Sequence, residues 1–266
     1  MPLRAKEQSV RRALAQSGRV AIAFSGGADS SLLLWLALDT LGPAQVLVLT
    51  ARSCLLPPRD LERAAGWPAR HGLAGRVSHV FVDIEPLAWG EFTRNPADRC
   101  YLCKSRVYRL FLEQVRRQGF AQLLDGTNAD DLRSDRPGLR AIDELEVVAP
   151  LAAADLSKAE VRTLSRELGL DTWDAPSASC LATRIPEGLT ITAERLARID
   201  ILETQLQHIG CAGCRVRLDR WHEDRAYVQV QEKDLQRLAG GRERTTLLNF
   251  FNDSGITKVF LDLQGR

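Results

Sequence analysis

Short apolar runs alternate with amphipathic stretches over the first 185 residues of the chain. The apolar runs predict buried strands over 19–24, 45–50, 77–83 and 122–125. Apolar residues at helical spacing predict helices over 7–17, 30–40, 58–71, 102–118 and 158–168, the last with a capping box of Ser157 and Glu160. Strands that alternate with helices indicate an α/β fold, with a parallel sheet and helices on both faces. Ligands of such sheets bind where the carboxyl ends of the strands meet, so these loops should share one site: 25–31, 50–56 and 125–131.

The pattern changes after residue 185, where the regular alternation of strands and helices stops. Helical spacing is followed by two strand patterns, a short helix and a final strand, over 191–208, 216–218, 227–230, 231–238 and 256–263. These elements indicate a small α+β unit. We therefore predict two domains, an α/β domain over residues 1–185 and a smaller α+β domain over residues 186–266.

The composition is that of an ordinary globular protein, with 45% hydrophobic and 26% charged residues. The net charge of +2 gives no global field of the kind that marks a nucleic-acid-binding protein. No apolar run approaches the roughly 20 residues that a membrane-spanning helix needs, and the basic N-terminus lacks the apolar core of a secretory signal. We expect a cytoplasmic protein without membrane partners. Its six cysteines then favour metal or redox chemistry over a disulfide framework.

The most informative segment is 25–31, Ser-Gly-Gly-Ala-Asp-Ser-Ser, between a predicted strand and a predicted helix. Gly26 and Gly27 permit backbone angles and close approaches that a Cβ would block. The amides at the helix start make a cradle for phosphate oxygens together with the hydroxyls of Ser25, Ser30 and Ser31. Asp29 would repel phosphate unless Mg²⁺ lies between them. The segment lacks the Gly-Lys-Ser/Thr ending of a Walker loop and resembles the pyrophosphate loop (PP-loop) of ATP pyrophosphatases, which adenylate their substrates.

Further polar residues follow the predicted strands and extend this candidate ATP site. Asp125 ends one strand, and the residues after it suit ATP or substrate binding, with a simple turn motif as the alternative. Beyond the 25–31 loop, we expect ATP to contact Ala23, Arg52, Gly126, Thr127, Asn128 and Asp131. We expect Cys54 to be a buried apolar thiol, although it follows the strand that ends at Thr50 and could instead line the ATP site.

Three other cysteines lie in two segments that suit metal chemistry. Cys100 and Cys103 form a CxxC pair before a predicted helix, and Cys180 lies in a stretch of small residues expected to form a mobile loop. A single CxxC pair can also be structural, and a zinc site would need a fourth ligand, which Cys211 or Cys214 could supply. Three thiolates could instead hold a [4Fe–4S] cluster with one iron free to carry sulfide to an electrophile such as an adenylated carboxylate.

Several charged residues lie beside these segments. Lys104 and Arg184 are adjacent to cysteines, where a cation would favour a thiolate or balance a phosphate. Arg215 and Arg217, two residues apart on a predicted strand, point to the same face. They could clamp a phosphate through bidentate hydrogen bonds, or they could be solvated charges at a strand edge.

The combination of motifs resembles the LarE family, the sulfur-inserting synthases for the nickel-pincer nucleotide cofactor of lactate racemase. The resemblance covers nearly the whole chain and is carried by segments 25–31, 98–104, 125–131, 136–141 and 179–186. Two departures are mild. Ala28 replaces the usual valine of the loop, and Arg-Ser-Asp at 133–135 replaces the usual Gly-Asp-Tyr.

The resemblance implies a two-step thiolation of pyridinium-3,5-biscarboxylic acid mononucleotide. ATP and Mg²⁺ would adenylate a carboxylate and release pyrophosphate, and sulfur from an unidentified donor would then displace AMP. In one branch of the family the cysteine matching Cys180 gives up its own sulfur and becomes dehydroalanine. In the other branch three cysteines hold a [4Fe–4S] cluster, and the presence of Cys100, Cys103 and Cys180 favours that branch.

The resemblance also implies roles for the small domain. Glu203 and Asp234 match acidic positions that the family uses, where they could orient the substrate or manage protons. The alternative for Glu203 is an ordinary carboxylate on a helix surface. The domain would bind substrate and support oligomerisation, since the family forms ring-like hexamers and a homo-oligomer is therefore expected.

Three other functions would use parts of the same sequence. A PP-loop tRNA thiolase also pairs this loop with cysteines, but it would need a basic RNA-binding surface, which the balanced charge disfavours. An ammonia-dependent amide-forming ligase would leave the three cysteines without a role. A nucleotide- or metal-binding regulatory module would bind ATP without releasing pyrophosphate.

Overall fold

The computed structural model describes residues 1–133, 137–176 and 179–265. Arg136 of the 136–141 motif, part of the 133–135 departure and part of the stretch before Cys180 lie outside the described residues. The chain divides into a first compact unit of residues 1–53, 58–84 and 98–175, and a second unit of residues 54–57, 85–97 and 176–266. The division into domains at residue 185 stays a prediction. Among the described residues, no helix has both the length and the apolar character that crossing a membrane requires.

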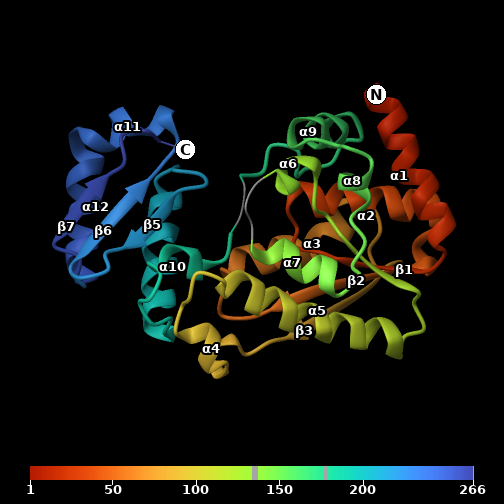
Figure 1. Cartoon of the computed structure of the whole chain (residues 1–266). Helices are drawn as coiled ribbons and strands as arrows, with labels where there is room; N and C mark the ends of the chain where they lie inside the picture. The colour runs from red at the N-terminus through yellow and green to blue at the C-terminus, as the bar shows by residue number, and fades with distance from the viewer. Residues whose placement is uncertain (134–136, 177–178, 266) are drawn as a thin grey trace. The chain divides into compact units, whose positions relative to one another are not determined.

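A four-stranded parallel sheet lies at the centre of the first unit (Figure 1). Its order is β3-β2-β1-β4, with β1 (Val20–Ala23), β2 (Val46–Arg52), β3 (Ser78–Asp83) and β4 (Gln122–Asp125). Val20 pairs with both Val46 and Gln122, so the carboxyl ends of the strands gather at one edge. The predicted parallel α/β fold is confirmed, and all four strands lie where the apolar runs predicted them.

Helices cover both faces of this sheet. One core joins β1 and β2 to α1 (Leu3–Ser17), α2 (Ala28–Leu41), α3 (Pro58–Arg70) and α9 (Lys158–Glu167). Helix α5 (Arg99–Arg117) lies on the opposite face (Figure 1). Helix α2 is apolar on nearly all sides because other elements enclose it, and Leu32, Leu33, Leu34 and Leu36 are all fully buried. The pattern did not predict three short helices, α6 (Ala129–Leu132), α7 (Pro137–Glu144) and α8 (Pro150–Ala153).

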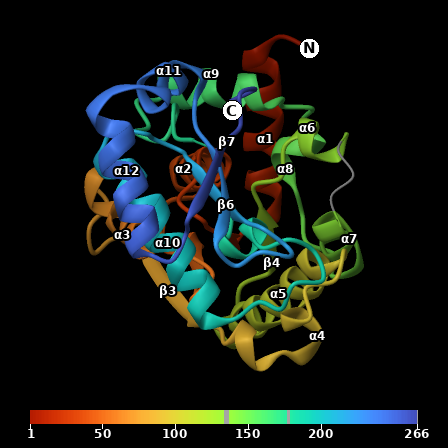
Figure 2. The same ribbon diagram turned by 90° about the vertical axis from the view of Figure 1, so that its left-hand side faces the viewer.

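The second unit is built on a three-stranded sheet of order β5-β6-β7. Its strands are β5 (Arg215–Leu218), β6 (Arg225–Gln229) and β7 (Lys258–Leu261), the first pair antiparallel and the second parallel. One face of this sheet packs on three helices, which Figure 2 shows beside the sheet: α10 (Ala193–His208), α11 (Glu232–Ala239) and α12 (Gly241–Asp253). The unit also contains α4 (Gly90–Thr93), a helix of a single turn. Helix α12 was not predicted, because its first half is polar and its buried apolar side chains come late, at Leu247 and Phe251.

A chain of hydrogen bonds links the residue after β1 to β2 and to the start of β3. The Thr50 hydroxyl donates to Phe24 O over 2.9 Å, and its oxygen lies 2.9 Å from His79 Nε2. Since the single hydroxyl proton goes to Phe24, Thr50 accepts a hydrogen bond from His79 Nε2–H. Burial lowers the pKa of His79 to about 4, so the ring is neutral at pH 7.

We predict that His79 makes the first unit acid-sensitive. Its pKa is lower in the folded chain than in the unfolded chain, so its contribution to stability is fully present above pH 6.5 and is lost as the pH falls towards 4. Denaturant unfolding at pH 7 and pH 5 should show a loss of unfolding free energy about 1–2 kcal/mol larger in the wild type than in His79→Gln, which cannot titrate. Equal losses in the two proteins would contradict this role.

Candidate active site

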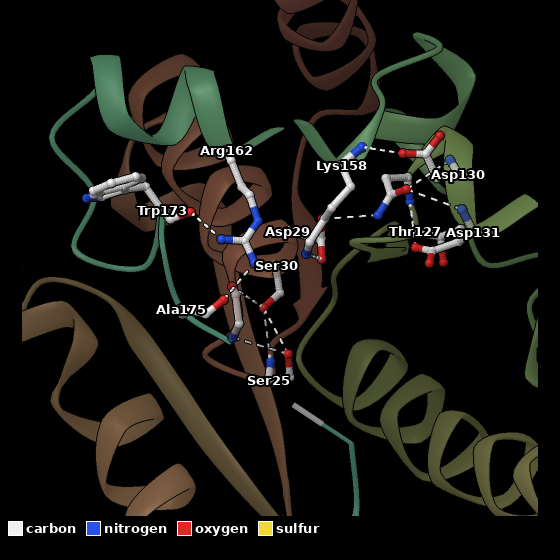
Figure 3. A network of polar contacts seen from close by, with 12 residues as sticks. Ser25, Asp29, Ser30, Thr127, Asp130, Asp131, Lys158, Arg162, Trp173 and Ala175 are labelled. Atoms are coloured by element: carbon white, nitrogen blue, oxygen red, sulfur yellow. Dashed lines mark hydrogen bonds and ion pairs between the residues drawn. The ribbon is translucent and has the colours of Figure 1, made fainter. Parts of the chain in front are cut away.

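The loop between β1 and α2 folds back on the first turn of the helix, as Figure 3 shows around Ser25 and Ser30. The Ser25 amide donates to Ser30 Oγ over 3.3 Å, the two hydroxyl oxygens lie 3.1 Å apart, and Ser30 Oγ donates to Gly27 O over 3.2 Å. Gly26 has a φ of +72°, and a Cβ there would lie 3.2 Å from Ala64 on α3. The loop therefore needs glycine at this position, and it holds its backbone at a helix N-terminus, where anions are favoured.

The turn after β4 packs directly on the start of α2. A Cβ on Gly126 would lie 2.9 Å from the Ser30 amide nitrogen and 3.0 Å from its Cα, both of which are backbone atoms that cannot move aside. Ala23, the last residue of β1, pairs with Asp125 on this side and with Leu49 on the other. The expected meeting of loops 25–31 and 125–131 is therefore present in the first unit.

The side chain of Asp29, on the first turn of α2, is held in place by two partners (Figure 3). Asn128 Nδ2 donates to Asp29 Oδ1 over 3.1 Å, and Lys158 Nζ forms an ion pair with Asp29 Oδ2. The Lys158 amide in turn donates to Asp130 over 2.8 Å. A lysine thus already balances the carboxylate for which the sequence suggested Mg²⁺, and a metal ion at Asp29 stays a prediction.

Sequence reasoning did not identify Lys158 as a site residue. The sequence predicts only a capping box over Ser157–Glu160. That capping box is present, because the Ser157 side chain accepts from the Glu160 amide and the Glu160 side chain accepts from the Ser157 amide. A lysine at the start of a helix gives no signal of a site by itself, because the partnership of Lys158 with Asp29 depends on how α9 packs against α2.

The residues after β4 form a second capping box. Asn128 accepts from the amides of Asp130 and Asp131 over 2.9 and 3.2 Å, and Asp131 accepts from the Asn128 amide over 3.1 Å. The Thr127 amide and hydroxyl both donate to Asp125. The turn motif is present, and it also holds Asn128 against Asp29. Contact of Thr127, Asn128 and Asp131 with ATP stays a prediction.

A buried charge network joins this turn to α5. Lys104 Nζ lies 3.3 Å from Asp125 Oδ2, and the Tyr108 hydroxyl donates to the same carboxylate. Burial disfavours the charged carboxylate, but Lys104 and the hydrogen bonds from Thr127 and Tyr108 outweigh it, and the pKa of Asp125 lies below its usual value. Lys104 is therefore adjacent to Cys103 in sequence, but its ammonium group pairs with the Asp125 carboxylate.

The CxxC pair lies within the first two turns of α5, rather than before the helix as expected. Cys100 is exposed and Cys103 half-buried, and their spacing of three residues places both on one side of the helix. Two thiols in this arrangement fit two ligand positions of an iron–sulfur cluster in chemistry and spacing. In the described part of the chain, no three cysteine, histidine or carboxylate side chains gather into a metal site, so a cluster that also uses Cys180 stays a prediction.

Cys180, in the second unit, precedes a 3-10 turn over Leu181–Arg184, where the sequence suggested a mobile loop. Arg184 organises this turn: its Nη1 donates to Ser179 O over 2.8 Å and to Cys180 O over 3.1 Å. Its other nitrogens form a bidentate pair with Glu203 at 2.8 and 3.1 Å. Glu203 also accepts from the Val216 amide at 2.9 Å, which ties the turn to α10 and β5.

The buried position of Glu203 bears on its predicted role. Its side chain is 1% exposed and that of Arg184 is 7% exposed, so this is a buried ion pair rather than a helix-surface carboxylate. Glu203 therefore positions the Cys180 turn through Arg184. A direct catalytic role for Glu203 stays a prediction.

The other predicted residues of the second unit lie on β5 and α11. Arg215 and Arg217 alternate with buried residues along β5 and share a face, where Arg217 Nη1 donates to Thr183 O over 3.0 Å. Asp234 is buried on the first turn of α11; its Oδ1 accepts from Arg237 over 2.9 Å, and its Oδ2 has no hydrogen-bond partner among the described residues. Substrate contacts of all three stay predictions.

Two remaining expectations concern strand-end and cysteine positions. Arg52, at the end of β2, is exposed and forms a bidentate pair with Asp83 at 2.5 and 2.7 Å. Cys54 is exposed, so the expectation of a buried thiol was wrong. Cys211 and Cys214 are the buried thiols, within the core of the second unit, and burial raises the pKa of Cys211.

Comparison with known proteins agrees with this geometry. No family model matches the chain. An uncharacterized protein of Synechocystis is 35% identical over 263 residues, which cover 99% of this chain and 95% of that protein. The pyridinium-3,5-bisthiocarboxylic acid mononucleotide synthase of Lactiplantibacillus plantarum is 32% identical over 230 residues, 86% of this chain and 81% of that protein. The chain belongs to the LarE family.

A more distant relative of this LarE family member is a component of the glutamine-hydrolysing GMP synthase of Thermoplasma volcanium. It is 30% identical over 209 residues, 71% of this chain and 64% of that protein. The likeness to this GMP synthase subunit agrees with the parallel α/β sheet of the first unit.

We predict that Gly126→Ala lowers the stability of this LarE family member and disturbs the candidate ATP site. The added methyl group would push the turn after β4 away from Ser30, so the unfolding free energy should fall by about 1–3 kcal/mol. Gly90→Ala is the control, because a Cβ there meets nothing within 4 Å. Denaturant unfolding and calorimetric titration with ATP would measure both effects, and wild-type values for Gly126→Ala would refute the prediction.

A second prediction concerns the buried pair in the second unit. Arg184→Met or Glu203→Met alone should each lower the unfolding free energy by about 3–5 kcal/mol, because each leaves a buried charge unpaired. The double variant should lose clearly less than the sum of the two. Glu223→Gln, in an exposed pair with Arg195, should cost less than about 1 kcal/mol. Additive losses for Arg184 and Glu203 would show that the two side chains are not energetically coupled and would contradict the prediction.

Proposed function

We propose that this chain is an ATP-dependent sulfur transferase that thiolates a carboxylate of pyridinium-3,5-biscarboxylic acid mononucleotide. The observation that carries the proposal is the pyrophosphate-type cradle of residues 25–31, stacked on the 125–131 turn within a chain that belongs to the LarE family. The name of the Lactiplantibacillus plantarum relative, a pyridinium-3,5-bisthiocarboxylic acid mononucleotide synthase, supplies the substrate class.

The first step would be adenylation in the first unit. The substrate carboxylate attacks the α-phosphate of ATP, a new acyl–phosphate bond forms, and the bond to pyrophosphate breaks. The start of α2 would hold the phosphates through backbone amides and the hydroxyls of Ser25, Ser30 and Ser31. Lys158, paired with Asp29, would place a positive charge beside them. Mg²⁺, which Asp29 would help to hold, supplies further neutralisation of the leaving pyrophosphate when bound.

The second step would be displacement of AMP by sulfur. Cys100, Cys103 and Cys180 are the residues that would hold a [4Fe–4S] cluster, which supplies the transferred sulfide when bound. The chain's own contribution is to bind and orient: Arg215 and Arg217 would hold the substrate phosphate, and Asp234 would accept a hydrogen bond through its buried Oδ2. Arg184 and Glu203 hold the turn that carries Cys180.

The alternative sulfur source is Cys180 itself. Its thiolate would attack the acyl adenylate and release AMP. A base would then take the Cα proton of Cys180, and the Cβ–S bond would break with its electron pair on sulfur, which leaves a thiocarboxylate on the substrate and dehydroalanine in the chain. We further propose a cytoplasmic homo-oligomer, with the smaller domain after residue 185 in substrate binding and assembly.

The test separates the two steps. Wild-type protein with ATP, Mg²⁺ and the mononucleotide should release pyrophosphate, and Cys180→Ala should still do so while forming no thiocarboxylate. Lys158→Met should slow pyrophosphate release about 10–100-fold, because a charge beside the phosphates is lost. Lys233→Met, which removes an exposed lysine of α11, should leave it unchanged. Formation of ADP and phosphate instead of pyrophosphate would overturn the proposal.

Protein purified without oxygen decides between the two sulfur sources. Three thiolate ligands predict about four irons per chain, lost in Cys100→Ala, Cys103→Ala and Cys180→Ala alike. Iron-free protein that loses the mass of H₂S at Cys180 in a single turnover would instead show the sacrificial route.

A further inference from the structure

One face of the three-stranded sheet in the second unit carries a row of side chains, of which the proposed steps use only Arg217. Arg217 of β5 lies opposite Tyr227 of β6, which lies opposite Phe260 of β7. The neighbouring positions in each strand, among them Val216 and Val228, point into the core. Tyr227 and Phe260 are instead 40% and 42% exposed, so two large aromatic rings stand on the open face.

The two rings form an ordered pair. Their centroids lie 5.0 Å apart with an interplanar angle of 19°, which is a stacked arrangement. The Tyr227 hydroxyl donates to Asp219 Oδ2 over 2.9 Å, and Asp219 is itself fixed by the amides of Trp221 and His222. A stacked ring pair with one ring anchored offers a preformed surface for a further planar ring, and most of all for a cationic one.

Positive charge surrounds this ring pair. The residues of the same face that flank the row along the strands are Arg215, Arg225 and Lys258, in addition to Arg217 within it. The carboxylates near this face are hydrogen-bonded: Asp219 to the Tyr227 hydroxyl, Asp262 to Gln229 Nε2 at 2.7 Å, and Asp224, beside Arg225 and Lys258, to the Thr257 hydroxyl at 2.5 Å. An aromatic surface with a basic rim complements a planar ring that also bears anionic groups, such as carboxylates and a phosphate.

The row is also connected to the Cys180 turn of the same unit. Arg217, which borders the ring pair, donates to Thr183 O over 3.0 Å. The Thr183 hydroxyl donates to Cys180 O over 2.8 Å. A ligand held by Arg217 and the rings would therefore bind on the element that fixes the backbone of the proposed sulfur-transferring cysteine.

We propose that Tyr227 and Phe260 form the ring-binding surface for the substrate mononucleotide. Its pyridinium ring stacks on the pair, and its phosphate and carboxylates meet the basic rim at Arg215, Arg217, Arg225 and Lys258. This inference rests on the proposed function for the identity of the ligand. The ring pair itself is an observation independent of the glycine loop, in the other compact unit.

The test separates ring binding from phosphate binding. Calorimetric titration compares pyridinium-3,5-biscarboxylic acid mononucleotide with ribose 5-phosphate, which lacks the ring. Tyr227→Leu and Phe260→Leu should each weaken mononucleotide binding about 3–10-fold and leave binding of ribose 5-phosphate unchanged. Tyr227→Phe keeps the ring and should stay within about 2-fold of wild type, whereas Arg217→Gln should weaken both ligands. Ile201→Ala, an exposed apolar residue of α10, should change neither.

Three results would overturn the inference. The first is unchanged mononucleotide affinity in both leucine variants. The second is dissociation of an oligomer in those variants with mononucleotide binding intact, which would make the face a contact between copies of the chain. The third is loss of binding to a single-stranded RNA with mononucleotide binding intact, which would make it an RNA surface.

Pyrophosphate release in the same variants separates this inference from the proposed function. If the leucine variants release pyrophosphate at the wild-type rate at saturating mononucleotide, but need more mononucleotide to reach half of that rate, the result supports both the inference and the proposed function. Ring-dependent binding in a wild type that releases no pyrophosphate would leave the ring surface standing and remove the proposed reaction.

Discussion

The close approach of the turn after β4 to the start of α2 is the constraint on which the candidate ATP site depends. Gly126 lies so near the Ser30 backbone that no side chain fits between them. This contact brings Asn128 to Asp29, and Lys158 completes the ion pair from α9. Three segments that are far apart in sequence thus meet beside one glycine loop. The negative charge of Asp29 is neutralised there by Lys158 before any ligand binds.

The sheet, its parallel order and the glycine loop could be predicted from the sequence because each depends on local signals: apolar runs, helical spacing and turn residues. Lys158 could not, since its role appears only when α9 lies against α2. The burial of Glu203 was missed for the same reason, because helix periodicity does not show that Arg184 lies opposite. Cys54 was wrongly expected to be buried, because the tendency of free cysteines to be buried does not decide the exposure of one residue in a loop after a strand. The late apolar residues of α12 explain why that helix was missed.

The two units divide the proposed chemistry between them. The first has the features of a nucleotide site, with a phosphate cradle and the CxxC pair connected through Lys104 and Asp125. The second holds Cys180 in a turn fixed by a buried ion pair and presents an aromatic, basic sheet face. Activation of a carboxylate would belong to the first unit and binding of the mononucleotide to the second.

The most direct test of this account follows oxygen rather than sulfur. The mononucleotide labelled with ¹⁸O in its carboxylates would be converted with unlabelled ATP, and the AMP would be analysed by mass spectrometry. Adenylation followed by displacement with sulfur predicts one ¹⁸O atom in the AMP phosphate for each thiocarboxylate formed. AMP without label, alongside a thiolated product, would contradict carboxylate adenylation as the step that this fold performs.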